Sequence, residues 1–392
     1  MEWKEVRLGE ISSKIGDGLH GTPKYDDEGP YYFINGNNLN CGKIIIKDDT
    51  KRVGKDEFVK NQKELNEQTI LVSINGTIGN VAKYNNELCI LGKSACYINV
   101  IKEVDKEFIY YVLTSANFKR NITNEATGTT IKNVSLKQMR EYKFNIPCNI
   151  SDQHRIASIL SSLDRKIELN NKINADFEEM AQAIFKNWFV DFEPFKDGKF
   201  VDSELGMIPE GWKVGGLFDI AEIFDKKRKP LSGNVREKMD KIYPYYGATS
   251  CMDYVDDYIF DGIYTLIGED GSVVKENGLP YMQYVWGKMW VNNHAHILQG
   301  KNGYSTEMIH ALLSITNIKF LVTGAVQAKL SQGNMQKILV AIPPKNVLDE
   351  IRPVIDNLYS KIRINTDENS RLSLLRDTLL PRLISGELEV PE

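Results

Sequence analysis

The clearest pattern in the chain is a row of apolar residues at alternating spacings of four and three, which predicts one face of a long α-helix. A second row with the same spacings lies 195 residues further along. The first row is Ile156, Leu160, Leu163, Ile167, Asn170, Asn174, Phe177, Ala181 and Ile184, and the second is Ile351, Ile355, Leu358, Ile362, Asn365, Asn369, Leu372, Arg376 and Leu379. We expect two long helices that pack on each other as a coiled coil.

Each row carries two asparagines within an otherwise largely apolar ridge. A buried asparagine lowers the stability of a coiled coil but fixes its register and the orientation of the partner helix. If the helices run antiparallel, Asn170 should face Asn369, and Asn174 should face Asn365. These four asparagines are the predicted register residues.

Other segments recur at similar distances, which indicates an internal repeat. Trp3, Lys4 and Leu8 match residues 212–217 at an offset of 209, and residues 128–135 match residues 324–331 at an offset of 196. Ile-Pro at 146–147 and at 342–343 closes the two halves. Because the offset shrinks along the chain, the halves differ mainly by insertions in their front parts.

The front part of each half predicts mixed α/β structure. Short runs of β-branched and aromatic residues bounded by Gly, Asn and Asp predict strands at residues 31–34, 44–46, 70–74, 96–101, 264–267 and 295–298. The expected fold is α+β, with two mixed α/β domains arranged as an internal repeat and separated by a pair of long antiparallel coiled-coil helices. The predicted boundaries are 1–148 and 211–345 for the domains, 149–190 for the first helix, 191–210 for a linker, and 346–386 for the second helix and tail. We expect Pro381 to end the second helix.

Composition limits the possible functions. The 392 residues carry a formal net charge of -4, so a nucleic-acid-binding role must depend on local basic patches or on partner subunits. No window approaches 18 uncharged apolar residues and the N-terminus lacks a secretory pattern, which predicts a cytoplasmic protein without a membrane span. Five scattered cysteines without a Cys-x-x-Cys pair argue against a disulfide framework and a zinc site.

Several motifs resemble catalytic or metal sites but fit poorly. Residues 92–94 end like a phosphate-binding loop, yet Glu87 stands where that motif requires glycine. His294 and His296 have strand spacing for a metal, although a structural role is the commoner one for such a pair. Nuclease-like carboxylates could come from Asp261, Glu269 and Asp270, but with 53 acidic residues such coincidences are expected. Methyltransferase motifs are absent, so we predict no catalytic residues and no metal site.

Basic runs and loops rich in Gly, Thr and Asn are the candidates for DNA contact. The densest basic run is residues 226–229, with Lys43, Lys47, Lys51 and Arg52 as a weaker counterpart in the first half; residues 17–25 and 73–80 are the polar loops. A solvated surface and ordinary turns are the alternative interpretations. The predicted DNA-binding residues are His20, Thr22, Lys24, Asn75, Thr77, Asn80, Thr129, Thr130, Lys132, Lys226, Lys227, Arg228, Lys229, Ser272, Gln327 and Lys329.

The helix ends carry a resemblance to a known family. Ile-Pro precedes a Gln-x-Arg-Ile start at Gln153, and the first long helix closes with IFKNWFVDF at residues 184–192. The second closes with LLPRLISGEL at residues 379–388, and the loop at 324–331 is similarly typical. Over essentially its whole length, the chain resembles the specificity subunit of a type I restriction-modification system.

The resemblance implies two target-recognition domains, each reading one half of a split double-stranded DNA target. It also implies two modification (methyltransferase) subunits and restriction (translocase and nuclease) subunits as partners. S-adenosylmethionine, ATP and Mg would belong to those partners, and this chain would bind no cofactor. Phe185, Trp188 and Phe189 are candidate partner-binding anchors, with a core position as the alternative. One departure is Ile131, which stands where the second half has Gln327.

Helix length agrees with this interpretation. Residues 152–186 would form a helix about 50 Å long at roughly 1.5 Å per residue, while one DNA turn separates half-sites by roughly 34 Å. Because the two front parts differ, we expect an asymmetric target with an unread gap. Two alternatives remain: a tandem-repeat adaptor that binds only protein, and a cryptic nuclease.

Overall fold

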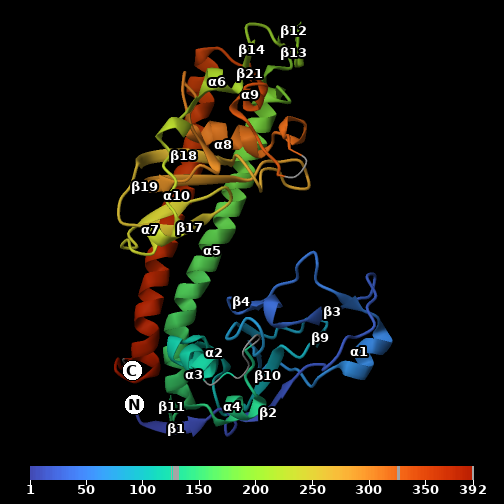
Figure 1. Cartoon of the computed structure of the whole chain (residues 1–392), viewed down its shortest axis with the longest axis vertical. Helices are drawn as coiled ribbons and strands as arrows, with labels where there is room; N and C mark the ends of the chain where they lie inside the picture. The colour runs from blue at the N-terminus through green and yellow to red at the C-terminus, as the bar shows by residue number, and fades with distance from the viewer. Residues whose placement is uncertain (125, 127–131, 325–326, 391–392) are drawn as a thin grey trace. The chain divides into compact units, whose positions relative to one another are not determined.

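The computed structural model in Figure 1 describes residues 1–124, 126, 132–324 and 327–390. The chain forms two compact units, a first unit of Met1–Glu168 with Glu368–Glu392 and a second unit of Leu169–Asp367. Two helices of 40 residues each, α5 (Ile150–Phe189) and α10 (Lys345–Ile384), contribute to both units. No helix among the described residues is long and apolar enough to span a membrane.

The first unit is built on a four-stranded antiparallel sheet with the order β2-β10-β7-β8. These strands are β2 (Ser12–Asp17), β10 (Ala95–Val100), β7 (Thr69–Ser73) and β8 (Val81–Lys83). Smaller sheets join β1 (Trp3–Arg7) to β11 (Lys143–Pro147), β3 (Tyr31–Ile34) to β6 (Arg52–Val53) and β9 (Cys89–Leu91), and β4 (Leu39–Asn40) to β5 (Lys43–Ile44). The helices are α1 (Lys55–Asn61), α2 (Lys106–Thr114), α3 (Ala116–Asn124) and α4 (Leu136–Glu141), with a 3-10 turn η1 (Gly36–Asn38).

The second unit has a six-stranded sheet with the order β15-β20-β18-β19-β16-β17. These strands are β15 (Ala221–Ile223), β20 (Ala295–Gly300), β18 (Phe260–Gly268), β19 (Met282–Val291), β16 (Tyr243–Tyr246) and β17 (Cys251–Val255). Two further pairs are β12 (Phe200–Ser203) with β13 (Gly206–Pro209), and β14 (Lys213–Gly216) with β21 (Leu339–Ile342). Its short helices are α6 (Leu217–Ile220), α7 (Gly233–Arg236), α8 (Thr306–Ser314) and α9 (Gln332–Met335), and its 3-10 turns are η2 (Glu193–Phe195), η3 (Asp225–Lys227) and η4 (Lys319–Leu321).

The internal repeat is confirmed at the level of topology. The order β2-β10-β7-β8 in the first unit matches β15-β20-β18-β19 in the second. Register also matches, because Ile15 pairs with Ile98 in the first unit and Ile223 pairs with Leu298 in the second. Helices α2 and α8 are offset by 200 residues, and α5 and α10 by 195. The two front parts therefore share one scaffold despite their different sequences.

Burial explains why these runs form strands. All five residues of β7 and all six of β10 are buried, as expected for central strands covered on both faces. Their Thr69 and Asn99 side chains are also buried and satisfy each other through a hydrogen bond of 2.7 Å. In the second unit, eight of the nine residues of α8 are buried, so this helix lies inside the core.

The two long helices pair antiparallel within each unit. In the second unit, Asn174 contacts Asn365, and Phe177 lies under Lys361, four residues before Asn365. In the first unit, Asp164 binds Arg376 at 2.7 Å and Lys166 binds Glu368 at 3.2 Å. None of the eighteen predicted seam residues is exposed. The predicted coiled-coil pattern therefore describes the packing in both units.

Some predicted boundaries need correction. The second helix does not end at Pro381 but continues to Ile384 and stops before Gly386, whose φ of 78° suits a left-handed helix terminus. Proline removes one backbone donor and its ring crowds the carbonyl four residues earlier. The helix continues past it here because Leu383 and Ile384 pack against the core of the first unit. The strand predicted at residues 44–46 is only Lys43–Ile44, and β19 was not predicted because Gly287 and Lys288 interrupt its apolar pattern.

Candidate nucleic-acid interface

A pair of loops is held together in the first unit by backbone hydrogen bonds. Val134 N donates to Ile74 O at 2.9 Å, and Gly76 N donates to Lys132 O at 3.4 Å. The first of these loops follows β7, and the second leads into α4, whose start is capped by the Ser135 hydroxyl. The polar loop predicted at residues 73–80 therefore has a fixed backbone at its base.

The second unit repeats this loop pairing. Leu330 N donates to Glu269 O at 2.8 Å, and Gly271 N donates to Ala328 O at 3.0 Å. The positions are shifted by 195 residues in one loop and 196 in the other, and Ser331 caps α9 as Ser135 caps α4. Each unit thus presents the same two-loop frame beside the end of a central strand.

Side chains on the two frames differ. At the bridge between the loops, the first unit has Asn75 and Asn133, whose amides are 3.2 Å apart. The second unit has Asp270 and Lys329 at the matching positions, and Asp270 also binds His294 at 2.6 Å. A shared backbone frame with different polar groups suits recognition of two different base sequences.

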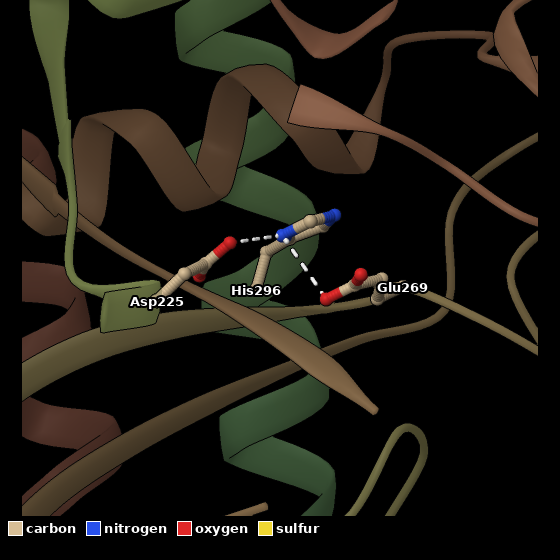
Figure 2. Close-up of side chains that lie close together, drawn as sticks. All are labelled: Asp225, Glu269 and His296. Atoms are coloured by element: carbon tan, nitrogen blue, oxygen red, sulfur yellow. Dashed lines mark hydrogen bonds and ion pairs between the residues drawn. The ribbon is translucent and has the colours of Figure 1, made fainter. Parts of the chain in front are cut away.

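The frame of the second unit is anchored by a buried ionic network, shown in Figure 2. His296 Nδ1 lies 2.5 Å from Asp225 Oδ2, and Nε2 lies 2.7 Å from Leu330 O. Both ring nitrogens face acceptors, so the ring bridges Asp225 and the backbone of the second loop. Because Leu330 belongs to the second loop, this histidine connects the loop to the end of β15.

A cation completes the network. Arg228 Nη1 donates to Glu269 Oε2 at 2.6 Å and to Ala295 O at 2.7 Å, with Asp225 Oδ2 3.4 Å from its Nη2. Two carboxylates therefore face the guanidinium of Arg228 and the imidazole of His296, and the guanidinium offsets part of the buried negative charge. Burial alone would raise the pKa of Asp225, but hydrogen bonds from His296 and Gln332 and the charges nearby lower it below its usual value.

Asp225, Glu269 and His296 are close enough to be considered as metal ligands, since their ligand atoms lie within 4.8 Å of one another. Their atoms are already engaged, however. Asp225 also accepts from Ile297 N at 3.1 Å and from Gln332 Nε2 at 2.6 Å, and Glu269 accepts from the guanidinium. This geometry favours a structural role and does not fit a bound cation.

The first unit supports its loops differently. By strand register, Asp17 corresponds to Asp225 and His20 to Arg228. His20 Nε2 lies 2.6 Å from Asp17 Oδ2. The positions matching His296 and Glu269 hold Cys96 and Ile74, which are both buried. The loop base is therefore mainly apolar in the first unit and ionic in the second.

This register corrects one sequence interpretation. The counterpart of the 226–229 run is the segment around His20, and the cluster of Lys43, Lys47, Lys51 and Arg52 does not match it. Lys43 instead binds Glu168 at 2.6 Å, and Arg52 stacks over Tyr32. Spacing along the chain could not show this, because the insertions shift the register between the halves.

Most predicted DNA-binding residues lie at the surface. The exposed ones are His20, Thr22, Lys24, Thr77, Lys132, Lys226, Lys227, Lys229, Ser272, Gln327 and Lys329, and the half-buried ones are Asn75, Asn80 and Arg228. Thr129 and Thr130 lie outside the described residues. Because its guanidinium is used inside the network, Arg228 supports the loops and is not free to contact DNA.

The predicted partner anchors are mostly core residues. Phe185 and Phe189 are 2% and 6% exposed and stack on each other, and Phe189 also contacts Trp212. They are unavailable to a partner because they form part of the core of the second unit. Trp188 is half-buried against Phe195, so its role as an anchor stays a prediction.

Sequence reasoning missed one signal. Residues 308–348 contain no Asp or Glu, although the chain has 53 acidic residues, and they contain Lys319, Lys329, Lys337 and Lys345. This segment includes the second loop of the frame in the second unit. A window count of charge would have identified a locally basic surface within a chain of net negative charge.

Comparison with known proteins identifies the family. A model described as the type I restriction modification DNA specificity domain matches residues 1–179 and 209–374. The chain belongs to this specificity family. Its two matches correspond to the two halves of the internal repeat, which confirms the predicted fold class.

Relatives of the specificity family match over most of the chain. The type I restriction enzyme MjaIX specificity subunit of Methanocaldococcus jannaschii is 27% identical, over 95% of this chain and 87% of the relative. The HindI specificity subunit of Haemophilus influenzae is 24% identical, over 72% and 77%. A crystal structure of the S subunit from M. genitalium, 20% identical, has the same fold with a TM-score of 0.56 over 98% and 96% of the two chains.

Proposed function

We propose that this chain is the DNA-recognition subunit of a type I restriction-modification complex. In this role each unit reads one half of a split, asymmetric double-stranded target, and the chain itself performs no catalysis. Modification subunits, two in number, and restriction subunits would bind it and carry S-adenosylmethionine, ATP and Mg. Family membership and the names of the full-length relatives support this assignment.

The observation that carries the proposal is the repeated two-loop frame. The same backbone hydrogen bonds hold residues 74–76 to 132–134 and residues 269–271 to 328–330. The frame is retained while the bridge pair changes from Asn75 and Asn133 to Asp270 and Lys329. Amides and charged groups read different patterns of donors and acceptors on base edges, so the two units should recognise unlike sequences.

Domain boundaries in this proposal follow the sequence expectation. Residues 1–148 and 211–345 would act as target-recognition domains, with residues 149–190 and 346–386 as the helices that carry them and residues 191–210 as the linker. The structure gives helix bounds of Ile150–Phe189 and Lys345–Ile384. Each of these helices is about 60 Å long at roughly 1.5 Å per residue.

The decisive experiment maps methylated adenines in genomic DNA after co-expression of this chain with its modification subunit. We expect one split, asymmetric motif with an unread gap of about six base pairs, since half-sites one turn apart are separated by roughly 10 base pairs. A methylome with no split motif would contradict the proposal. Co-expression without this chain is the control and should give no methylation at the motif.

A loop exchange then assigns each half of the motif. Substituting Asp270→Asn together with Lys329→Asn gives the second unit the bridge pair of the first. We expect base discrimination to change in only one half of the motif, because the frame of the first unit is untouched. Asn75→Asp with Asn133→Lys is the matched exchange and should affect the other half.

Experiments on the purified chain and on its complex with the partner subunits distinguish the alternative functions. An adaptor that binds only protein would assemble with the partner subunits without conferring affinity for any split DNA sequence. A cryptic nuclease would cut DNA as the purified chain with magnesium alone. Asp225 and Glu269 argue against a nuclease site, because their carboxylates already bind His296 and Arg228.

A further inference from the structure

One aromatic side chain of the second unit is almost completely exposed. Phe320 in the turn η4 is 90% exposed, while the next most exposed large apolar residue among those described is Leu374, at 69%. Burying a phenylalanine side chain stabilises a protein by roughly 1.5–3 kcal/mol. The exposed ring of Phe320 does not provide this stabilisation, so the stability of the fold does not explain why an aromatic residue is present there.

The backbone beneath Phe320 is firmly held. Ile318 is fully buried and its N–H donates to Gly278 O at 2.9 Å. Leu321 N donates to Ile318 O at 2.8 Å, and Leu321 O accepts from Asn334 Nδ2 at 2.8 Å. These bonds fix both sides of the residue, so the ring projects outward from an ordered turn.

Lysines are connected to this turn, and acidic residues are absent from its segment. Lys319 precedes the ring and is exposed, and Lys337 Nζ binds the Oδ1 atom of Asn334 at 3.0 Å. Thr323, three residues after the ring, pairs with Lys329 through two backbone hydrogen bonds of 2.7 and 2.9 Å. The ring thus belongs to the same acid-free segment as the loop that we assign to DNA recognition.

The first unit lacks this feature. Helix α3 (Ala116–Asn124) follows α2 there, whereas η4 follows α8 in the second unit. The aromatic residue of α3 is Phe118, which is fully buried. Among the described residues, an exposed phenylalanine beside the two-loop frame therefore occurs in the second unit only.

The structure assigns Phe320 as an apolar wedge that stacks on bases of the DNA duplex contacted by the second unit. This inference rests on the proposed DNA-recognition function. Lysines around the ring would bind phosphates while the ring displaces or stacks on a base pair, as apolar wedges do when they unstack and kink DNA. A protein partner is less suited to this surface, because protein interfaces bury clusters of apolar side chains and are depleted in lysine.

The test uses the complete complex of this chain with its modification subunits on a duplex that carries the mapped target. Thymines are placed in the gap and flanks, and their oxidation by permanganate reports unstacking. We expect enhanced reactivity at a thymine in the gap or flank next to the half of the target that the loop exchange assigns to the second unit. Phe320→Ala should abolish it and weaken DNA affinity by about 5- to 150-fold, since one aromatic–base stack is worth about 1–3 kcal/mol.

Two further variants make the result specific. Phe320→Trp should restore both reactivity and affinity, because indole also stacks on bases. Tyr254→Ala, at an aromatic position of the same unit that is 48% exposed, is the matched control and should change neither. Thymines opposite the methylated adenines are the internal reference. Their permanganate reactivity depends on the modification subunits, so it should be similar in the two halves of the target and unaffected by Phe320→Ala.

Unchanged reactivity and affinity in Phe320→Ala would overturn the wedge. Impaired assembly of Phe320→Ala with the modification subunits in the absence of DNA would also overturn it, because the ring would then contact protein. Failure of the proposed function looks different, since the wild-type complex would then show no affinity for a split target before any variant is compared.

Discussion

Asn365 Nδ2 donates a hydrogen bond of 2.9 Å to Asn174 Oδ1 across the antiparallel helix pair of the second unit. Asn174 in turn donates to the Thr366 hydroxyl at 3.2 Å. The sequence pattern predicted that these two asparagines face each other. Their role in fixing the register remains a prediction, as does that of Asn170, which is fully buried in the second unit, and of Asn369, which is half-buried in the first.

The asparagine pair can be tested by single and double substitution. Asn174→Leu should lower the free energy of unfolding by about 1–3 kcal/mol, because the amide of Asn365 loses its acceptor. The double variant with Asn365→Leu should recover much of this loss. Urea denaturation measures both, and Asn187→Leu, at an exposed asparagine on the same helix, is the control. Equal losses in all three variants would exclude a specific role for the pair.

Removing the buried imidazole of His296 should loosen the loop frame of the second unit. His296→Leu leaves Asp225 buried without its main partner, and breaking a buried ion pair in this way costs about 3–5 kcal/mol. Hydrogen exchange at the amides of Lys329 and Leu330 should become faster. His294→Leu breaks a partly exposed pair with Asp270 and should cost about 1 kcal/mol or less. If exchange in this loop were unchanged in His296→Leu, the network would not be its anchor.

Acid should destabilise the second unit through His310. Burial lowers the pKa of this histidine from 6.5 to about 4, with a smaller effect of the charge of Lys275. Its pKa in the folded state lies below its pKa in the unfolded state. The contribution of neutral His310 to the free energy of unfolding is therefore fully present above pH 6.5 and is lost as the pH falls toward 4. The loss should reach about 3 kcal/mol, measured as urea unfolding against pH.

A matched pair of variants isolates this effect. His310→Phe keeps a ring beside Tyr284 and Tyr359 but cannot be protonated, so stability should vary less between pH 4 and 6.5. His154→Gln changes a histidine that is 73% exposed and should retain the wild-type pH dependence. The same pH dependence in wild type and His310→Phe would show that other groups cause it.

The basic run after β15 should contribute salt-dependent affinity for DNA. Lys226→Gln should weaken binding of the complex to target and non-target duplexes by similar factors, and lower the slope of log affinity against log salt by about 0.9. Lys196→Gln, at a lysine paired with Glu193 by a 2.6 Å bond, is the control. An unchanged slope for Lys226→Gln would place that lysine outside the DNA contact.

A core role for Phe185 predicts a loss of stability that does not depend on partners. Phe185→Ala should lower the free energy of unfolding of the isolated chain by about 3–5 kcal/mol, because it leaves a cavity against Phe189. Urea denaturation of the chain without DNA or partner subunits measures this. A stable Phe185→Ala chain that fails to assemble with the modification subunits would restore the interpretation of Phe185 as an anchor.

The amino-acid sequence by itself determined the elements that depend on local periodicity. A helix seam repeats every seven residues and a strand core forms continuous apolar runs, so the two long helices, the internal repeat and most central strands could be predicted. The facing of Asn174 and Asn365 also followed, because antiparallel pairing of two seams fixes which positions meet.

Only the tertiary structure decided which polar residues lie together. Asp225, Glu269 and His296 are distant in sequence and meet because β15, β20 and β18 are neighbours in one sheet. Insertions of different length hid the match between His20 and Arg228. Arg228 lies inside although its basic run suggested a surface role, and the structure places Phe185 and Phe189 in the core, which the sequence left open as one of two alternatives. Register between strands and the direction of a side chain depend on contacts far along the chain, which local patterns do not encode.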